Sequence, residues 1–74
     1  MSSARTPRNI RQQEAIRALV RAGGVERRAK GGHRAVTMAN GHTVPVPSGR
    51  LKTGTLNAIV KQAGLTMGQF IDLL

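Results

Sequence analysis

The chain has 74 residues, with 12 Lys and Arg against 3 Asp and Glu, so its net charge at neutral pH is +9. With no Cys and two His it cannot form a disulfide framework or supply the four ligands of a structural zinc site, and its stability must come from packing. No apolar run has the length of a membrane span, and the N-terminus lacks the apolar segment of a secretory signal. We therefore expect one small cytoplasmic domain that needs no metal or cofactor.

The positive charge is concentrated in the first half of the sequence. Residues 1–34 hold nine Lys and Arg and two acidic residues, whereas residues 35–74 hold three and one. Cations clustered on a small surface gain free energy by displacing counterions from phosphates, so nucleic acid is the first candidate partner. A basic tail on an unrelated domain would give the same total, and charge alone leaves that alternative open.

The chain begins with a basic segment, residues 1–8, that has no apolar periodicity. We predict that it is a flexible arm outside a single domain of residues 9–74. A helix is predicted over about residues 9–22, because an apolar stripe and a polar stripe alternate there with helical spacing. The apolar stripe is Ile16, Leu19 and Val20, and the opposite one is Gln13, Arg17 and Arg21. Gly23 and Gly24 end this helix.

Three short antiparallel strands are predicted next, over residues 25–30, 34–38 and 42–46. The first two runs alternate with period two, and Asn40-Gly41 between the second and third is a strong hairpin signal. Pro45 and Pro47 indicate that the third strand lies at an edge of the sheet or ends there, since proline cannot donate to a central ladder.

Two helices are predicted after the strands. The first has one apolar face, Leu56, Ile59, Val60 and Ala63, and Gly64 stands where a left-handed C-terminal cap is expected. Thr66 and Gln69 have the spacing of a capping box that begins the second helix, with Leu65 and Phe70 as a hydrophobic staple. Its predicted buried stripe is Met67, Phe70, Ile71 and Leu74. The sequence thus predicts an α+β fold of order αβββαα, with a three-stranded antiparallel sheet covered by helices on one face.

The strand periodicity also predicts which side chains lie on the open face of the sheet. If Val36 and Met38 face the helices, Arg34 shares their side and His33 points outward. In the first strand we expect Val25 and Ala29 to point inward. Glu26 is expected on the open face, together with Arg28, Lys30 and His33, which would make this face cationic.

Gly31, Gly32 and His33 form the most informative tripeptide. Two glycines leave the histidine without bulky neighbours and permit a tight turn whose backbone amides could face a phosphate. The alternative is an ordinary β-turn with a solvated histidine, which the local pattern alone favours. His42, beside the hairpin turn, is the weaker candidate for a direct role.

Cleavage of RNA needs a base to take the proton of a 2′-hydroxyl and cations to stabilise the extra negative charge on the phosphate. An unperturbed imidazole has a pKa of about 6.5 and can act as this base without a metal. His33 is the candidate, and the candidate phosphate-binding residues around it are Arg28, Lys30, Gly31, Gly32 and Arg34. No carboxylate is placed to protonate the leaving 5′-oxygen, so the sequence assigns no second catalytic group.

The scarcity of aromatic residues excludes some RNA-binding folds. RRM and cold-shock domains stack bases on Phe or Tyr, and the single aromatic residue, Phe70, belongs to a predicted helix stripe. The basic stripe of the first helix could contact phosphates or could be a solvated surface, and the sequence does not distinguish these.

Several short pieces follow one another in this chain in a specific order and spacing: Ala22-Gly23-Gly24, Lys30-Gly31-Gly32-His33, Val44-Pro45-Val46 with Ser48-Gly49, Lys52-Thr53-Gly54-Thr55-Leu56, and Lys61-Gln62-Ala63-Gly64-Leu65. With these pieces, residues 16–74 resemble the HicA toxins of bacterial type II toxin-antitoxin pairs. The resemblance does not extend to the basic arm.

The resemblance implies a fold similar to the double-stranded RNA-binding domain and an endoribonuclease that cleaves mRNA and arrests translation. It also implies one catalytic histidine, at the position of His33, and a more acidic HicB-like antitoxin that covers the RNA-binding surface. The chain departs from the family pattern at two positions: Gly32 replaces the usual serine, and Arg34 stands where many relatives carry a second histidine. These departures concern substrate preference and rate more than fold.

The sequence leaves two competing functions open. The first is a non-catalytic RNA-binding module that uses the same sheet face. The second is a protein whose main role is to bind its partner, with degenerate activity.

Overall fold

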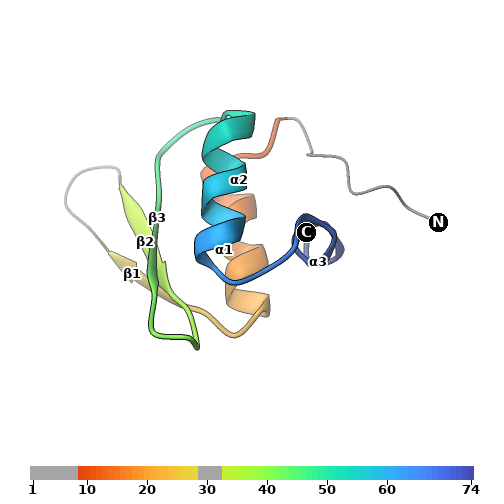
Figure 1. Cartoon of the computed structure of the whole chain (residues 1–74). Coiled ribbons are helices and arrows are strands. Elements are labelled where there is room, and N and C mark those ends of the chain that lie inside the picture. Colours follow the sequence, from red (N-terminus) through yellow and green to blue (C-terminus); the bar gives the residue numbers. More distant parts are fainter. Residues whose placement is uncertain (1–8, 29–32) are drawn as a thin grey trace.

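A computed structural model describes residues 9–28 and 33–74 (Figure 1). The elements are α1 (Gln12–Arg21), β1 (Val25–Arg28), β2 (Arg34–Thr37), β3 (Thr43–Val46), α2 (Thr53–Gln62) and α3 (Met67–Asp72). The predicted α+β fold and its order αβββαα are therefore confirmed. The predicted arm at residues 1–8 and the segment 29–32, which contains Lys30, Gly31 and Gly32, lie outside the described residues.

The sheet is antiparallel, in the order β1-β2-β3, and the helices lie on one side of it (Figure 1). Helix α1 contacts all three strands and α2 contacts β3, whereas α3 packs on α1 and α2 and lies farther from the sheet. Val36, Val44 and Val46 are fully buried beneath the helices. No helix of the described structure covers the other face of the sheet.

The core is entirely apolar: the described residues include no buried polar or charged side chain. Phe70 is its largest fully buried side chain. The predicted apolar face of α2 is confirmed, because the four residues assigned to it, Leu56, Ile59, Val60 and Ala63, are all buried. In α1, however, Val20 is 43% exposed, and the buried residues are Ala15, Ile16, Ala18 and Leu19. Two alanines lie on the buried side of α1, and the larger Val20 lies outside it.

Helix α1 begins later than the sequence predicts, because the residues before it pair with those before α2. The Leu51 amide donates to the Ile10 carbonyl (2.8 Å), and the Gln12 amide donates to the Gly49 carbonyl (3.1 Å). Ile10 and Leu51 are both buried. We call this pairing of residues 10–12 with residues 49–51 the N-terminal bridge; neither segment carries enough alternation for sequence reasoning to find it.

Glycines form the turns where they are predicted. Gly23 ends α1 with φ at +102°, and Gly64 follows α2 with φ at +76°. Gly41, with φ at +87°, lies in the turn between β2 and β3, which closes through a hydrogen bond from the Met38 amide to the His42 carbonyl (2.8 Å). The Asn40-Gly41 hairpin is thus confirmed.

Helix α3 begins with the predicted capping box. The Gln69 amide donates to Thr66 Oγ1 (3.1 Å), and the Thr66 amide donates to Gln69 Oε1 (2.9 Å). The prediction that Leu74 is buried is wrong: Leu74 is 41% exposed, and Leu73 packs against the core instead. The helix ends at Asp72, so helical spacing no longer applies to the last residues.

No helix among the described residues is long and apolar enough to cross a membrane.

Candidate functional site

His33 lies immediately before β2, and its side chain is exposed. It lines a cleft with a volume of about 380 Å³ between the β3 edge of the sheet and α2. The other lining residues are Pro45, Pro47, Thr55, Ala58, Ile59 and Gln62. We call this the proline cleft.

The strand register and the helix periodicity determine which residues line this cleft. Arg34 pairs with Val46, so the preceding His33 lies beside Pro47 at the end of the sheet. Helix α2 packs on β3 and presents one stripe to the cleft, spaced i, i+3, i+4 and i+7 from Thr55 to Gln62. The sequence predicted the exposed histidine but gave no signal for the cleft, which needs residues from β3 and α2 at once.

The prediction for the two faces of β1 is wrong. Glu26 pairs with Val36 and Arg28 pairs with Arg34, and directly paired residues of an antiparallel sheet share a face. Arg28 therefore lies on the helix side of the sheet. The open face instead carries Arg27 and Val25, the latter 56% exposed.

Gly24 explains this inversion. A Cβ on Gly24 would meet the side chains of Val36 and Met38, both buried beneath the helices, so residue 24 faces the helices and residues 26 and 28 share its phase. All four residues of β1 are exposed, so burial does not determine which face of the sheet each side chain takes. The apolar character of Val25 therefore predicted the wrong face.

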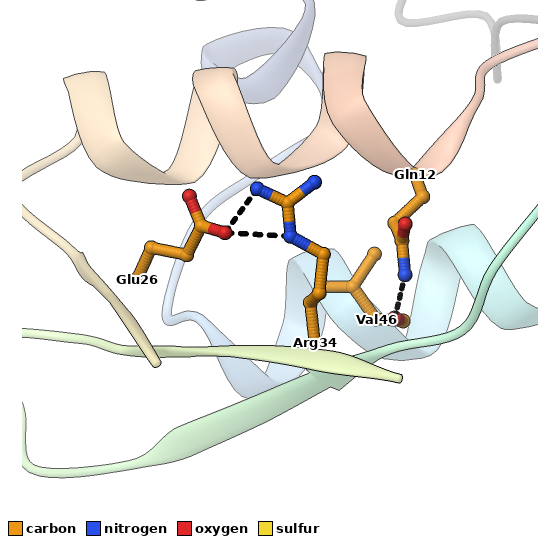
Figure 2. A network of polar contacts seen from close by, with 4 residues as sticks. All are labelled: Gln12, Glu26, Arg34 and Val46. Atoms are coloured by element: carbon orange, nitrogen blue, oxygen red, sulfur yellow. Dashed lines mark hydrogen bonds and ion pairs between the residues drawn. The ribbon is translucent and has the colours of Figure 1, made fainter. Parts of the chain in front are cut away.

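Glu26 and Arg34 form an ion pair, which Figure 2 shows between the sheet and α1. Arg34 Nε donates to Glu26 Oε2 (2.6 Å), and Nη2 contacts the same oxygen. Both side chains are about one-third exposed. The charge of Arg34, one of the predicted phosphate-binding residues, is therefore shared with a carboxylate, which the sequence did not indicate. Beside this pair, Gln12 Nε2 donates to the Val46 carbonyl (2.9 Å) and joins α1 to the end of β3 (Figure 2).

Other cationic side chains of the site and of α1 differ in their contacts. Arg28, a predicted phosphate-binding residue, is exposed and forms no ion pair within the described residues. On the basic stripe of α1, Arg17 is exposed, but Arg21 Nη1 donates to the Leu73 carbonyl (2.7 Å) and so fastens α3 to α1. Arg21 is thus partly structural.

Within residues 9–28 and 33–74, no group of three or more His, Cys, Asp or Glu residues could hold a metal ion.

The family model for the HicA toxin of bacterial toxin-antitoxin systems matches residues 13–65. The chain belongs to the HicA toxin family. The match runs from the second residue of α1 to Leu65, and it includes His33 and the other described residues that line the proline cleft. The resemblance predicted from the sequence is confirmed, and the protein is a toxin of a toxin-antitoxin system. No curated protein matches the chain.

Proposed function

We propose that this HicA-family toxin is a metal-independent endoribonuclease that cleaves mRNA and so arrests translation. The observation that carries the proposal is the position of His33: it is exposed and lies at the edge of a cleft within the region that matches the family. A general base must reach the proton that it removes, and an exposed imidazole beside a cleft meets that condition.

The proposed reaction is an attack by the RNA on its own backbone. The imidazole of His33 takes the proton of a ribose 2′-hydroxyl, and the 2′-oxygen attacks the neighbouring phosphorus. The bond to the 5′-oxygen breaks, and this oxygen takes a proton from the imidazolium or from water. The products are a 2′,3′-cyclic phosphate and a 5′-hydroxyl, and DNA is not a substrate because it lacks the 2′-hydroxyl.

Five residues are proposed to bind the phosphate: Arg28, Lys30, Gly31, Gly32 and Arg34. The exposure of Arg28 supports its inclusion. Arg34 would share its charge between Glu26 and the RNA, so we expect it to contribute less than Arg28 does. The net charge of +9 favours a polyanionic partner over a neutral one.

The proposed protein partner is a HicB-like antitoxin more acidic than this chain. A toxin-antitoxin pair needs a partner that blocks the toxin, and an acidic protein would compete with RNA for the same cations. We place its binding surface over His33 and the residues around it.

Substitution of the two histidines tests the enzyme assignment. We expect His33→Ala to reduce cleavage of RNA by about 100-fold or more, the usual contribution of a general base, while binding of RNA changes little. His42→Ala is the matched control, because His42 is the second histidine of the chain, is also exposed, and lies at the β2–β3 turn. Cleavage by purified His33→Ala at the wild-type rate would favour the non-catalytic RNA-binding module.

A further inference from the structure

The proline cleft has the size and lining of a small-ligand site. Its volume of about 380 Å³ lies within the range of about 300 to 1,000 Å³ typical of such sites, which are mostly apolar with a few polar groups. We propose that the cleft binds the base of one unpaired RNA nucleotide beside the phosphate that is cut at His33. This inference rests on the proposed function and adds a determinant of substrate specificity to it.

The walls of the cleft can hold a flat apolar surface. Pro45 and Pro47 contribute rings from the strand side, while Ala58 and Ile59 contribute alkyl groups from α2. Ile59 is almost fully buried, so it closes the cleft toward the core. The single aromatic side chain, Phe70, is buried and does not line the cleft, so a bound base would pack on prolines and alkyl groups rather than stack on an aromatic ring.

The polar groups of the cleft can form hydrogen bonds with the edge of a nucleobase. Gln62 offers a carboxamide with both donors and an acceptor, and Thr55 offers a hydroxyl. Neither side chain has a hydrogen-bond partner within the described structure, so both are available to a ligand. None of the described residues that line the cleft is a carboxylate, so the phosphate that joins the bound nucleotide to the next one would meet no negative charge from them.

The position of His33 connects this cleft to the chemistry. Because His33 is itself a lining residue, a nucleotide with its base between the prolines and α2 would have its ribose and phosphate close to the imidazole. A base can enter the cleft only when it is unstacked and unpaired. The proposal therefore predicts cleavage in single-stranded RNA, a dependence on the base next to the cut, and resistance of duplex RNA.

Binding of RNA that cannot be cut tests the cleft apart from catalysis. The probe is a set of 2′-O-methyl RNA trinucleotides that differ only in the central base, and their dissociation constants are measured by isothermal titration calorimetry. Ala58→Leu places a larger side chain in the cleft, and leucine is a good helix former at this exposed position of α2. We expect it to weaken binding by about fivefold or more, comparable to the loss of one net hydrogen bond. Asn57→Leu, at an exposed neighbouring position that does not line the cleft, should change binding by less than about twofold.

A second variant tests base recognition. Gln62→Ala removes the carboxamide, and we expect the affinities for the four trinucleotides to become more alike; Lys61→Ala, which leaves the cleft lining unchanged, should retain their order. The inference is overturned if Ala58→Leu binds all four trinucleotides as wild type does, or if wild type binds all four equally. Unchanged trinucleotide binding with weakened binding of the co-expressed antitoxin would make the cleft a protein contact and would also overturn it. His33→Ala does not enter these measurements, so failure of the proposed enzyme activity is detected separately.

Discussion

At Gly24 the backbone comes too close to three core atoms to carry a side chain. A Cβ built there would lie 2.8 Å from Met38 Sδ and 2.9 Å from the Leu19 carbonyl oxygen, and nearer still to Val36 Cγ1. Gly24 therefore does more than end α1. It allows the chain to pass against β2, and it fixes which side chains of β1 face the helices.

Replacement of Gly24 should accordingly destabilise the fold. We expect Gly24→Ala to lower the free energy of unfolding by about 1 to 3 kcal/mol, the usual cost of overpacking a core. Gly54→Ala is the matched control: Gly54 lies in α2, a Cβ there meets nothing within 4 Å, and alanine should raise stability by about 0.5 to 1 kcal/mol. Urea denaturation followed by circular dichroism measures both, and equal stability of Gly24→Ala and wild type would contradict the packing argument.

The site residues could be predicted from the sequence only in part. The exposure of His33 followed correctly from its position before a strand with Val36 buried. The ion pair of Arg34 and the inward phase of Arg28 could not be predicted, because both depend on the β1–β2 register. Gly24 sets this register through contacts that sequence spacing does not contain. The sequence thus identifies candidate site residues, but it does not show whether their charges are paired.

Helix α3 is shorter than α1 and α2, and it depends on side-chain interactions for its stability. It has six residues, fewer than an isolated helix needs, and it packs on α1 and α2 rather than on the sheet. Three interactions hold it: the capping box at Thr66, the buried ring of Phe70, and the hydrogen bond from Arg21 to Leu73. The capping box and the ring follow from sequence spacing, whereas the hydrogen bond joins residues far apart in the chain.

Loss of the cap should therefore be measurable. We expect Thr66→Ala to lower the free energy of unfolding by about 1 kcal/mol, because the Gln69 amide loses its acceptor. Thr53→Ala is the control, since Thr53 begins α2 and forms no side-chain hydrogen bond in the described part of the chain. Thermal unfolding of the two variants under the same conditions makes the comparison, and equal midpoints would show that the capping box adds nothing.

The buried face of α2 could be predicted better than the faces of β1. The apolar stripe of α2 is long enough to show its period, and it was placed correctly. Each strand has only four residues, so one misleading side chain, Val25, reversed the predicted faces of β1. The N-terminal bridge was missed for a related reason: it pairs two short segments that are distant in sequence.

For the molecule as a whole, the net charge of +9 sets the electrostatics of binding. We expect the affinity for single-stranded RNA to fall linearly on a log–log plot against salt, with a slope of about −0.7 for each phosphate that is neutralised. Glu26→Gln should strengthen binding and steepen this slope, because it releases Arg34 from its ion pair. Its stability should change by less than about 1 kcal/mol, as for other exposed pairs.

Asp72→Asn is the matched control for this charge change. It adds the same unit of charge on α3, which packs away from the sheet. Fluorescence anisotropy with a labelled RNA at several salt concentrations gives both slopes. A salt-independent affinity, or an equal response to the two substitutions, would contradict the proposed role of the cations around Arg34.

The N-terminal bridge also has a consequence for the order of folding. All three strands lie between the two segments that it joins, so the hairpin between β2 and β3 can form before the bridge closes the longer loop around it. Contacts absent from the transition state affect mainly the unfolding rate, so Ile10→Val should accelerate unfolding and leave the folding rate nearly unchanged in stopped-flow measurements. The bridge would then break before the rate-limiting step of unfolding, and its strength would set part of the lifetime of the native state.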